Sequence, residues 1–176
     1  MIKRLFPPRC LPSRVTRLLY DIADAFCFAL VFFAILSAFV LRPSGVSGAS
    51  MEPTLRDGQY VLLFVAGDAR HGDIVVVSEK AMRGPNSSVL VKRVIGLPGD
   101  VIDIDFDAGT VFRNGEALDE PYIAQATQRR GDVAFPVAVE EGTIFVLGDN
   151  RNHSADSRDS NIGLIDQRYL IGRVIF

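Results

Sequence analysis

The sequence predicts a mainly β protein that carries one transmembrane helix near its N-terminus. The helix is predicted by an apolar run of 17 residues, Ala25–Leu41, that contains no charged side chain. The β structure is predicted by short segments rich in Val and Ile, which follow Leu55 and are separated by turns containing Gly and Pro. No convincing amphipathic helix and no repeat is seen after Leu55. A chain of 176 residues therefore suits one β domain behind one membrane anchor.

The apolar run is long enough to cross a bilayer. Together with Leu18–Ala23 it approaches the roughly 20 residues that span a hydrocarbon core, and Asp21 and Asp24 would lie at the interface. A buried core helix and a cleavable secretory signal are the alternatives, and the small residues before Ser50 resemble a cleavage site. We favour a retained anchor, because the run exceeds the about 7 to 15 apolar residues of a signal peptide.

Charge is distributed unevenly along the chain. Every charged residue before Asp21 is basic, whereas acidic residues outnumber basic ones from Arg42 onward. The positive-inside rule then predicts a cytoplasmic basic tail (residues 1–18), a single-pass plasma-membrane anchor (19–41) and an extracytoplasmic β domain (42–176). An acidic domain without a basic patch argues against nucleic-acid binding.

The cysteines and histidines suggest little chemistry of their own. Cys10 lies in the basic tail and Cys27 in the apolar run, so no disulfide framework is available. His71 and His153 are far from each other and from both cysteines in sequence, so we expect no zinc site.

Seven segments after Leu55 are predicted to be strands. The fifth ends in Asn-Gly, which is a strong signal for a hairpin turn. Arg83–Ser88 and Ala124–Asp132 are expected to be exposed loops. The seven segments are Gln59–Val65, Asp73–Ser78, Val89–Ile95, Asp100–Asp105, Thr110–Gly115, Gly142–Asp149 and Tyr169–Phe176.

Three stretches combine polar and turn-forming residues with neighbouring apolar strands. They are SGASMEPTL (Ser47–Leu55), VKRVIGLPGD (Val91–Asp100) and GDNRNHSADSRDS (Gly148–Ser160). In the second stretch, alternation along a strand puts Lys92 and Arg93 on opposite faces. One of these two side chains should therefore point inward.

A serine needs a base to become a nucleophile. Lysine can serve when burial lowers its pKa, and Lys92 lies in a Val-rich strand. The alternative is a lysine on the solvated face of that strand. A mechanism based on His153 beside Ser154 is disfavoured, because adjacent side chains diverge and a single His in a polar loop is usually solvated. The residues thus suggest a pair of Ser50 and Lys92, although nothing in the spacing proves the pairing.

The stretch Gly148–Ser160 also has two interpretations. An Asp-rich turn or weak calcium loop is one, but the EF-hand pattern and its closing Glu are missing. In the other, Asp156 pairs with Arg158 and Ser154 hydrogen-bonds a buried amine. Such groups would hold a catalytic base in position.

Taken in order behind one anchor, these motifs resemble those of bacterial type I signal peptidase. The resemblance covers about Leu19–Phe176 and includes GDIVVV (Gly72–Val77) between the first two stretches. It implies a β-barrel-like catalytic domain of the compact form, because the segment between Lys92 and Gly148 is short. It also implies a membrane-bound serine endopeptidase that removes signal peptides from secreted pre-proteins. Lys92 points to the bacterial or organellar branch, because the eukaryotic reticulum forms have His there.

The resemblance assigns a role to each matching residue. Ser50 would be the nucleophile, and its backbone N–H would hold the oxyanion. Lys92 would be the general base, and the residues expected to support this dyad are Met51, Ser154, Asp156 and Arg158. No metal or cofactor is implied. The expected partners are signal peptides of secretory pre-proteins and membrane lipid, and we expect a monomer.

Three positions depart from the family pattern. Gly48 stands where some members have a hydroxyl residue as a second oxyanion donor, so a side-chain contact to the oxyanion is not expected. Asn152 and His153 stand where Asp or Asn is common, which we interpret as tolerated loop variation.

The resemblance also explains why Ser50 lies so close to the anchor. Nine residues beyond Leu41 reach at most about 30 Å, so Ser50 stays near the outer boundary of the membrane, where signal-peptide cleavage sites emerge. The resemblance further implies substrates with small residues at the first and third positions before the cut. We expect them to bind extended by strand addition, and we expect activity to fall at acidic pH because the lysine must be neutral.

Other functions are compatible with the same residues. A related Ser–Lys protease could mature one dedicated conjugation or pilus protein, and substrate breadth would distinguish it. A catalytically silent anchored β domain could bind partners. A β-lactamase-like enzyme is disfavoured, because Pro53 stands where the Lys of a Ser-x-x-Lys motif would be.

Overall fold

The N-terminal apolar segment forms a single helix, α1 (Arg14–Phe39). In this computed structural model, the described residues are 14–65, 67–81 and 89–175, so the predicted loop Arg83–Ser88 and most of the basic tail lie outside them. The helix has 26 residues. At 1.5 Å per residue it is about 39 Å long, enough for a hydrocarbon core. Its window Arg14–Ser37 is apolar enough to cross a membrane and is 0% buried, which does not fit the core helix of a soluble protein.

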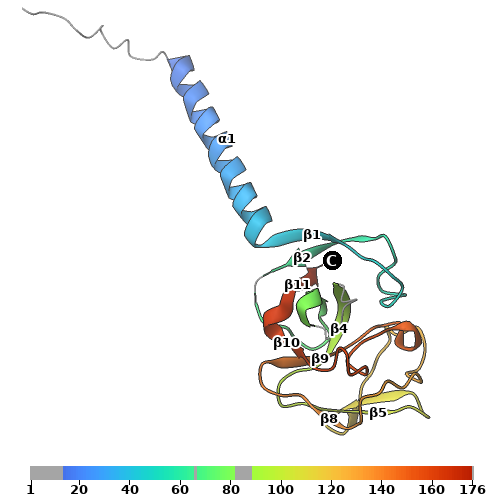
Figure 1. The fold of residues 1–176 in the computed structure, drawn as a ribbon. Helices are drawn as coiled ribbons and strands as arrows, with labels where there is room; N and C mark the ends of the chain where they lie inside the picture. The colour runs from blue at the N-terminus through green and yellow to red at the C-terminus, as the bar shows by residue number, and fades with distance from the viewer. Residues whose placement is uncertain (1–13, 66, 82–88, 176) are drawn as a thin grey trace, which may run out of the picture. The chain divides into compact units, whose positions relative to one another are not determined.

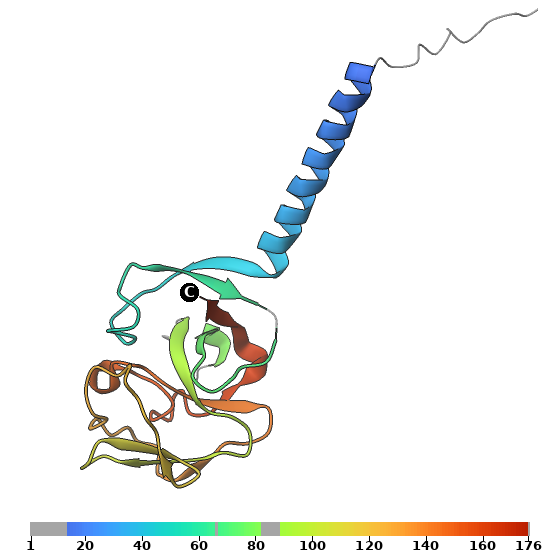
Figure 2. The same cartoon turned by 180° about the vertical axis from the view of Figure 1, so that it is seen from behind.

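The second unit of the chain, Val40–Phe176, contains two antiparallel sheets. The larger sheet has seven strands in the order β1-β2-β11-β3-β4-β9-β10, and the smaller has four in the order β7-β6-β5-β8. Figures 1 and 2 show β5 and β8 at the opposite end of this unit from β1 and β2. The strands are β1 (Leu41–Gly45), β2 (Tyr60–Phe64), β3 (Ile74–Val77), β4 (Leu90–Gly96), β5 (Val101–Asp105), β6 (Thr110–Arg113), β7 (Glu116–Ala117), β8 (Val137–Ala138), β9 (Thr143–Leu147), β10 (Ile165–Asp166) and β11 (Leu170–Ile175). The described helices of this unit are the short 3₁₀ turns η1 (Glu79–Ala81), η2 (Arg151–His153) and η3 (Gln167–Tyr169).

The strands follow from the Val- and Ile-rich segments, and the prediction of a mainly β domain is confirmed. The Asn-Gly pair joins β6 to β7 as a hairpin. Asn114 and Gly115 have φ values of 55° and 81°, the left-handed pair that a type I′ turn requires. The sequence did not predict β1, β8 or β10. Strand β1 contains Pro43, which an edge strand tolerates because its outer N–H groups have no partner in the sheet.

The buried apolar residues form three clusters in this unit. One cluster combines residues of β4, β5, β6 and β9, so the two sheets share a core. Another, which we call the first apolar cluster, lies beneath the turn that follows β1. It comprises Val46, Met51, Leu55, Val61, Leu63, Ile74, Val76 and Val174, with Val91 and Ile171 packed against it.

Strand β4 changes its strand partner along its length, and the two pairings overlap at Arg93. On one side its first half, Leu90 to Arg93, pairs with β3. On the other side β9 begins to pair at Arg93, opposite Leu147. The outer edge of Leu90–Lys92 therefore has no strand partner among the described residues. Strand β1, at the end of the sheet, has a second edge without a strand partner among the described residues.

Candidate active site

Ser50 lies at the start of a tight turn that follows β1. The turn is closed by two backbone hydrogen bonds, from Glu52 N to Ala49 O at 3.2 Å and from Leu55 N to Met51 O at 2.9 Å. Met51 and Leu55 are spaced by four residues, and both are buried in the first apolar cluster. Their burial fixes the turn to the core, while Ser50 itself stays partly exposed at its beginning.

Lys92 reaches Ser50 from strand β4. Its Nζ donates a hydrogen bond to Ser50 Oγ at 2.8 Å and another to Val91 O at 2.9 Å. The lysine is only 2% exposed. The two residues are 42 positions apart in sequence, so the pairing depends entirely on the fold.

The environment of Lys92 favours its neutral form. Burial lowers its pKa from 10.5 to about 8, because a buried ammonium loses its hydration. The carboxylates of Asp156 and Asp149 act in the opposite direction, and burial outweighs them. A substantial fraction of Lys92 is therefore unprotonated at mildly alkaline pH and can accept a proton from Ser50.

The stretch Gly148–Ser160, which we call the acid-rich loop, contacts the backbone of the turn. Asn150 N donates to Ser50 O at 3.0 Å, and Asn150 Nδ2 donates to Ala49 O at 3.1 Å. Gly148 allows this close approach, since a Cβ there would lie 2.6 Å from Ser50 O and 2.2 Å from Ser154 Oγ. The loop thus holds Ser50 from the side opposite the core.

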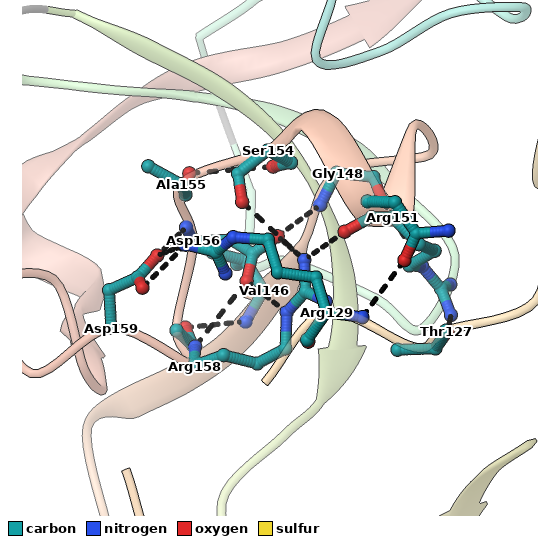
Figure 3. A network of polar contacts seen from close by, with 12 residues as sticks. Thr127, Arg129, Val146, Gly148, Arg151, Ser154, Ala155, Asp156, Arg158 and Asp159 are labelled. Atoms are coloured by element: carbon teal, nitrogen blue, oxygen red, sulfur yellow. Dashed lines mark hydrogen bonds and ion pairs between the residues drawn. The ribbon is translucent and has the colours of Figure 1, made fainter. Parts of the chain in front are cut away.

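Asp156 and Arg158 form the expected ion pair behind this loop. Both side chains are fully buried, with Arg158 Nε at 2.8 Å from Asp156 Oδ1 and Nη2 at 2.8 Å from Oδ2. Figure 3 shows this pair among the polar contacts that join the loop to its surroundings. Asp156 Oδ2 also accepts from Gly148 N at 3.1 Å, and Arg158 Nη2 donates to Arg151 O at 2.6 Å. The pair therefore fixes the course of the loop at both of its ends.

Ser154 is buried beside Gly148 but is not bonded to the lysine. Its Oγ contacts Ala155 O at 3.4 Å, and among the described residues no hydrogen bond joins it to Lys92 Nζ. The bond to a buried amine that the sequence suggested is thus absent in this conformation. Ser154 fills the space next to the dyad.

The sequence expectation that one of Lys92 and Arg93 points inward was too narrow, because both are buried. Arg93 leaves the opposite face of β4 and forms a bidentate pair with Asp149, at 2.8 and 2.6 Å. Its guanidinium also lies 3.9 Å from the centre of the Tyr122 ring. Both faces of β4 are covered, so alternation separates the two side chains without exposing either.

Several of these supporting residues were missed in the sequence. Asp149 also accepts a hydrogen bond from Thr54 Oγ1, which links the serine turn to the strand of the lysine through Arg93. A second buried pair joins Arg151 to Glu120 at 2.6 Å. Thr54, Arg93, Asp149 and Arg151 lie within the three polar stretches named in the sequence, and Glu120 does not. Their position in those stretches was the only sequence signal that could have identified them as supporting residues.

The histidines do not contact Ser50. His153 is exposed and lies 3.3 Å from Asn150 Oδ1, and His71 Nε2 lies 2.6 Å from Asp100 Oδ2. Among the described residues, the only side-chain partner of the Ser50 hydroxyl is Lys92. The described part of the chain also holds no group of three His, Cys, Asp or Glu residues suited to a metal ion.

Gly48 cannot supply an oxyanion donor through a side chain. Its φ of +88° is strained for any other residue, and its N–H donates to Asp57 Oδ1 at 2.8 Å. The Ser50 N–H, in contrast, donates to no acceptor among the described residues. It is therefore available to a ligand at the serine.

Comparison with known proteins gives consistent matches. Residues 19–176 match the family model described as signal peptidase, peptidase S26. The chain is 36% identical over 166 residues to signal peptidase I of Bacillus licheniformis, which covers 88% of this chain and 85% of the relative. It is 34% identical over 174 residues to signal peptidase IB of Staphylococcus aureus strain N315, again covering 88% and 85%. A crystal structure of a signal peptidase I from Enterococcus faecalis V583 is 30% identical and covers 62% of this chain and 98% of its own, with a TM-score of 0.47.

Proposed function

Because the chain belongs to the signal peptidase family, peptidase S26, and is a serine endopeptidase that removes signal peptides, we propose that Ser50 is its nucleophile and Lys92 its general base. The observation that carries this proposal is the 2.8 Å contact between Lys92 Nζ and Ser50 Oγ. It lies within the range in which a base can take a proton directly. Met51, Ser154, Asp156 and Arg158 would support the pair by packing and by holding the acid-rich loop.

The reaction would begin with neutral Lys92. The amine takes the proton of the Ser50 hydroxyl while Oγ attacks the carbonyl carbon of the scissile bond. The carbon–nitrogen bond then breaks, and the Lys92 ammonium returns the proton to the leaving amine of the mature protein. An ester between Ser50 and the signal peptide remains. Water gives a proton to Lys92 and attacks the carbonyl carbon of this ester. The bond from that carbon to Ser50 Oγ then breaks, and Oγ takes the proton back from the Lys92 ammonium. The signal peptide leaves as a carboxylic acid, which loses its proton to the solvent.

Negative charge that develops on the substrate carbonyl would be held by the Ser50 N–H. This donor has no partner among the described residues, so binding the oxyanion would break no existing bond. Gly48 adds no hydroxyl, so we propose that backbone donors alone serve here.

The signal peptide would bind as an added strand. Within the described part of the chain, the outer edge of Leu90–Lys92 and the edge strand β1 both have backbone groups without a strand partner. Extended peptides commonly pair with such edges. Val46 and Val91 belong to or pack against the first apolar cluster, so small apolar substrate residues would find an apolar surface there.

For the whole chain we propose a single-pass plasma-membrane protein that acts as a monomer. Residues 1–18 would be cytoplasmic, residues 19–41 would anchor the chain in the lipid, and residues 42–176 would form the extracytoplasmic catalytic domain. Support comes from the exposed apolar helix and from the basic residues that precede Asp21. Protease added to the outside of intact spheroplasts would digest the catalytic domain if this orientation is right and would spare it if the orientation is reversed.

The assignment of the dyad is tested by comparing wild type, Ser50→Ala and Lys92→Ala in detergent. Each is mixed with a pre-protein whose signal peptide ends in Ala-x-Ala, and the products are identified by mass spectrometry. Cleavage after the second Ala by wild type alone is the expected result. Equal cleavage by all three would refute the assignment, and cleavage by none would favour a dedicated substrate or a silent binding domain.

A further inference from the structure

A polar groove lies next to the turn that carries Ser50. Its volume of about 420 Å³ is within the range of ligand-binding clefts. The residues that line it include Glu52, Arg56, Ala124, Gln125, Asn150 and His153. This groove is joined directly to the nucleophile, because Asn150 donates hydrogen bonds to the backbone carbonyls of Ser50 and Ala49.

The turn that carries Ser50 contributes different residues to the core and to the groove. Met51 and Leu55 point from the turn into the first apolar cluster, against which Val91 of the open β4 edge packs. Glu52 and Arg56 follow these residues by one position each and line the groove. A substrate that pairs with the open edge on the apolar side and passes Ser50 would therefore continue into the polar groove.

From this arrangement we infer that the polar groove binds the first residues of the mature protein, and that Glu52 and Arg56 select their charges. The inference rests on the proposed function of Ser50 and Lys92. Neither the Glu52 carboxylate nor the Arg56 guanidinium forms an ion pair with another described residue. Each charge is thus free to meet a complementary side chain of the substrate.

The amide of Asn152 holds the segment that follows the lining residue Ala124. Asn152 Oδ1 accepts from Gln128 N at 3.0 Å and Arg129 N at 2.9 Å, and its Nδ2 donates to Gln125 Oε1 at 3.2 Å and Ala126 O at 3.1 Å. All four hydrogen-bonding positions of the amide are used on this loop. Asn152 therefore fixes the segment that carries the lining residue Gln125 to the acid-rich loop.

The selection is tested with peptides that share one Ala-x-Ala signal sequence. A single Lys, Asp or Gln is introduced at each of the first four mature positions, and kcat/KM is measured for each peptide. Wild type should prefer Lys over Gln at one position and Asp over Gln at another, each by about threefold, the size expected for exposed ion pairs. Both preferences should shrink in 0.5 M NaCl, because salt screens exposed charges.

Two variants assign the preferences to residues. Glu52→Gln should abolish only the preference for Lys, and Arg56→Gln only the preference for Asp. Arg70→Gln, which removes an exposed arginine outside the groove, should keep both. Thermal unfolding of each variant checks that it is folded.

The outcomes separate this inference from the function on which it rests. If wild type cleaves the Gln peptides but shows no charge preference, or if the preferences survive in both groove variants, the inference is wrong and the dyad is untouched. If wild type cleaves none of the peptides, the proposed function itself fails.

Discussion

Replacing Lys92 by Met removes the buried amine while keeping a side chain of similar length and volume. The free energy of unfolding should then respond to pH differently from that of wild type. In the folded protein the pKa of Lys92 is about 8, whereas the unfolded chain should titrate near the ordinary value of 10.5. The unfolded state therefore binds the proton more tightly, and protonation disfavours folding.

The sign and size of the effect follow from these two values. Above pH 10.5 the lysine is neutral in both states and costs nothing, and below pH 8 it is charged in both states and the full cost applies. Between pH 8 and pH 10.5, the free energy of unfolding of wild type should rise by about 3 kcal/mol relative to that of Lys92→Met, because each pKa unit corresponds to about 1.36 kcal/mol. The lost hydrogen bonds to Ser50 and Val91 add an offset that does not depend on pH, of about 1 kcal/mol each.

The assay is urea unfolding of the detergent-solubilised chain from pH 7 to pH 11, followed by far-ultraviolet circular dichroism. Ionisable groups that are present in both proteins contribute equally to the two unfolding free energies, so their contributions cancel when one is subtracted from the other. Lys80→Met is the matched control, because Lys80 is exposed and its curve should run parallel to wild type. A difference between wild type and Lys92→Met that stays constant across this range would refute the claim that burial makes the lysine a base.

Three further results are expected. The kcat/KM of wild type should fall tenfold per pH unit below pH 8, so that a stopped assay at pH 6 gives about a hundredth of the plateau, and a flat profile would exclude a lysine base. Asp149→Ala leaves Arg93 buried without its carboxylate and should lower the free energy of unfolding by about 3 to 5 kcal/mol in urea, whereas a loss below 1 kcal/mol would mean that the pair is solvated. Gly148→Ala brings a methyl group within 2.6 Å of Ser50 O and should reduce kcat by more than about tenfold, whereas an unchanged kcat would mean that the acid-rich loop moves aside without disturbing Ser50.

The strands were predictable because their signal is local. Val and Ile enrichment marks the longer ones, and Asn114–Gly115 marks the hairpin between β6 and β7. Strand β1 gives no such signal, because Pro43 and Gly45 are poor strand formers and only pairing with β2 makes the segment extended. Strands of two residues, such as β8 and β10, are too short to leave any pattern.

The site was predictable as a set of residues but not as a geometry. Composition makes Ser50 and Lys92 candidates, and the resemblance to a family joins them, but only the curled sheet brings the two atoms to 2.8 Å. Alternation along β4 implied that one of Lys92 and Arg93 faces solvent. It failed because loops cover the second face of the sheet, and a sequence pattern does not report what a distant loop covers.

The charges around Lys92 pose a physical problem that the fold resolves. A base that must be neutral lies beside a loop containing several aspartates, and unpaired carboxylates would raise its pKa. In the structure Asp149 is neutralised by Arg93 and Asp156 by Arg158, both in bidentate geometry. Both carboxylates still raise the pKa of Lys92, but burial lowers it by more, so burial decides the direction of the shift. The same carboxylates order the site, because Asp149 accepts a hydrogen bond from Thr54 Oγ1 of the serine turn and Asp156 accepts one from Gly148 N of the acid-rich loop. Each carboxylate is paired with an arginine and orders the site, while the burial of Lys92 keeps its pKa below the ordinary value in spite of them.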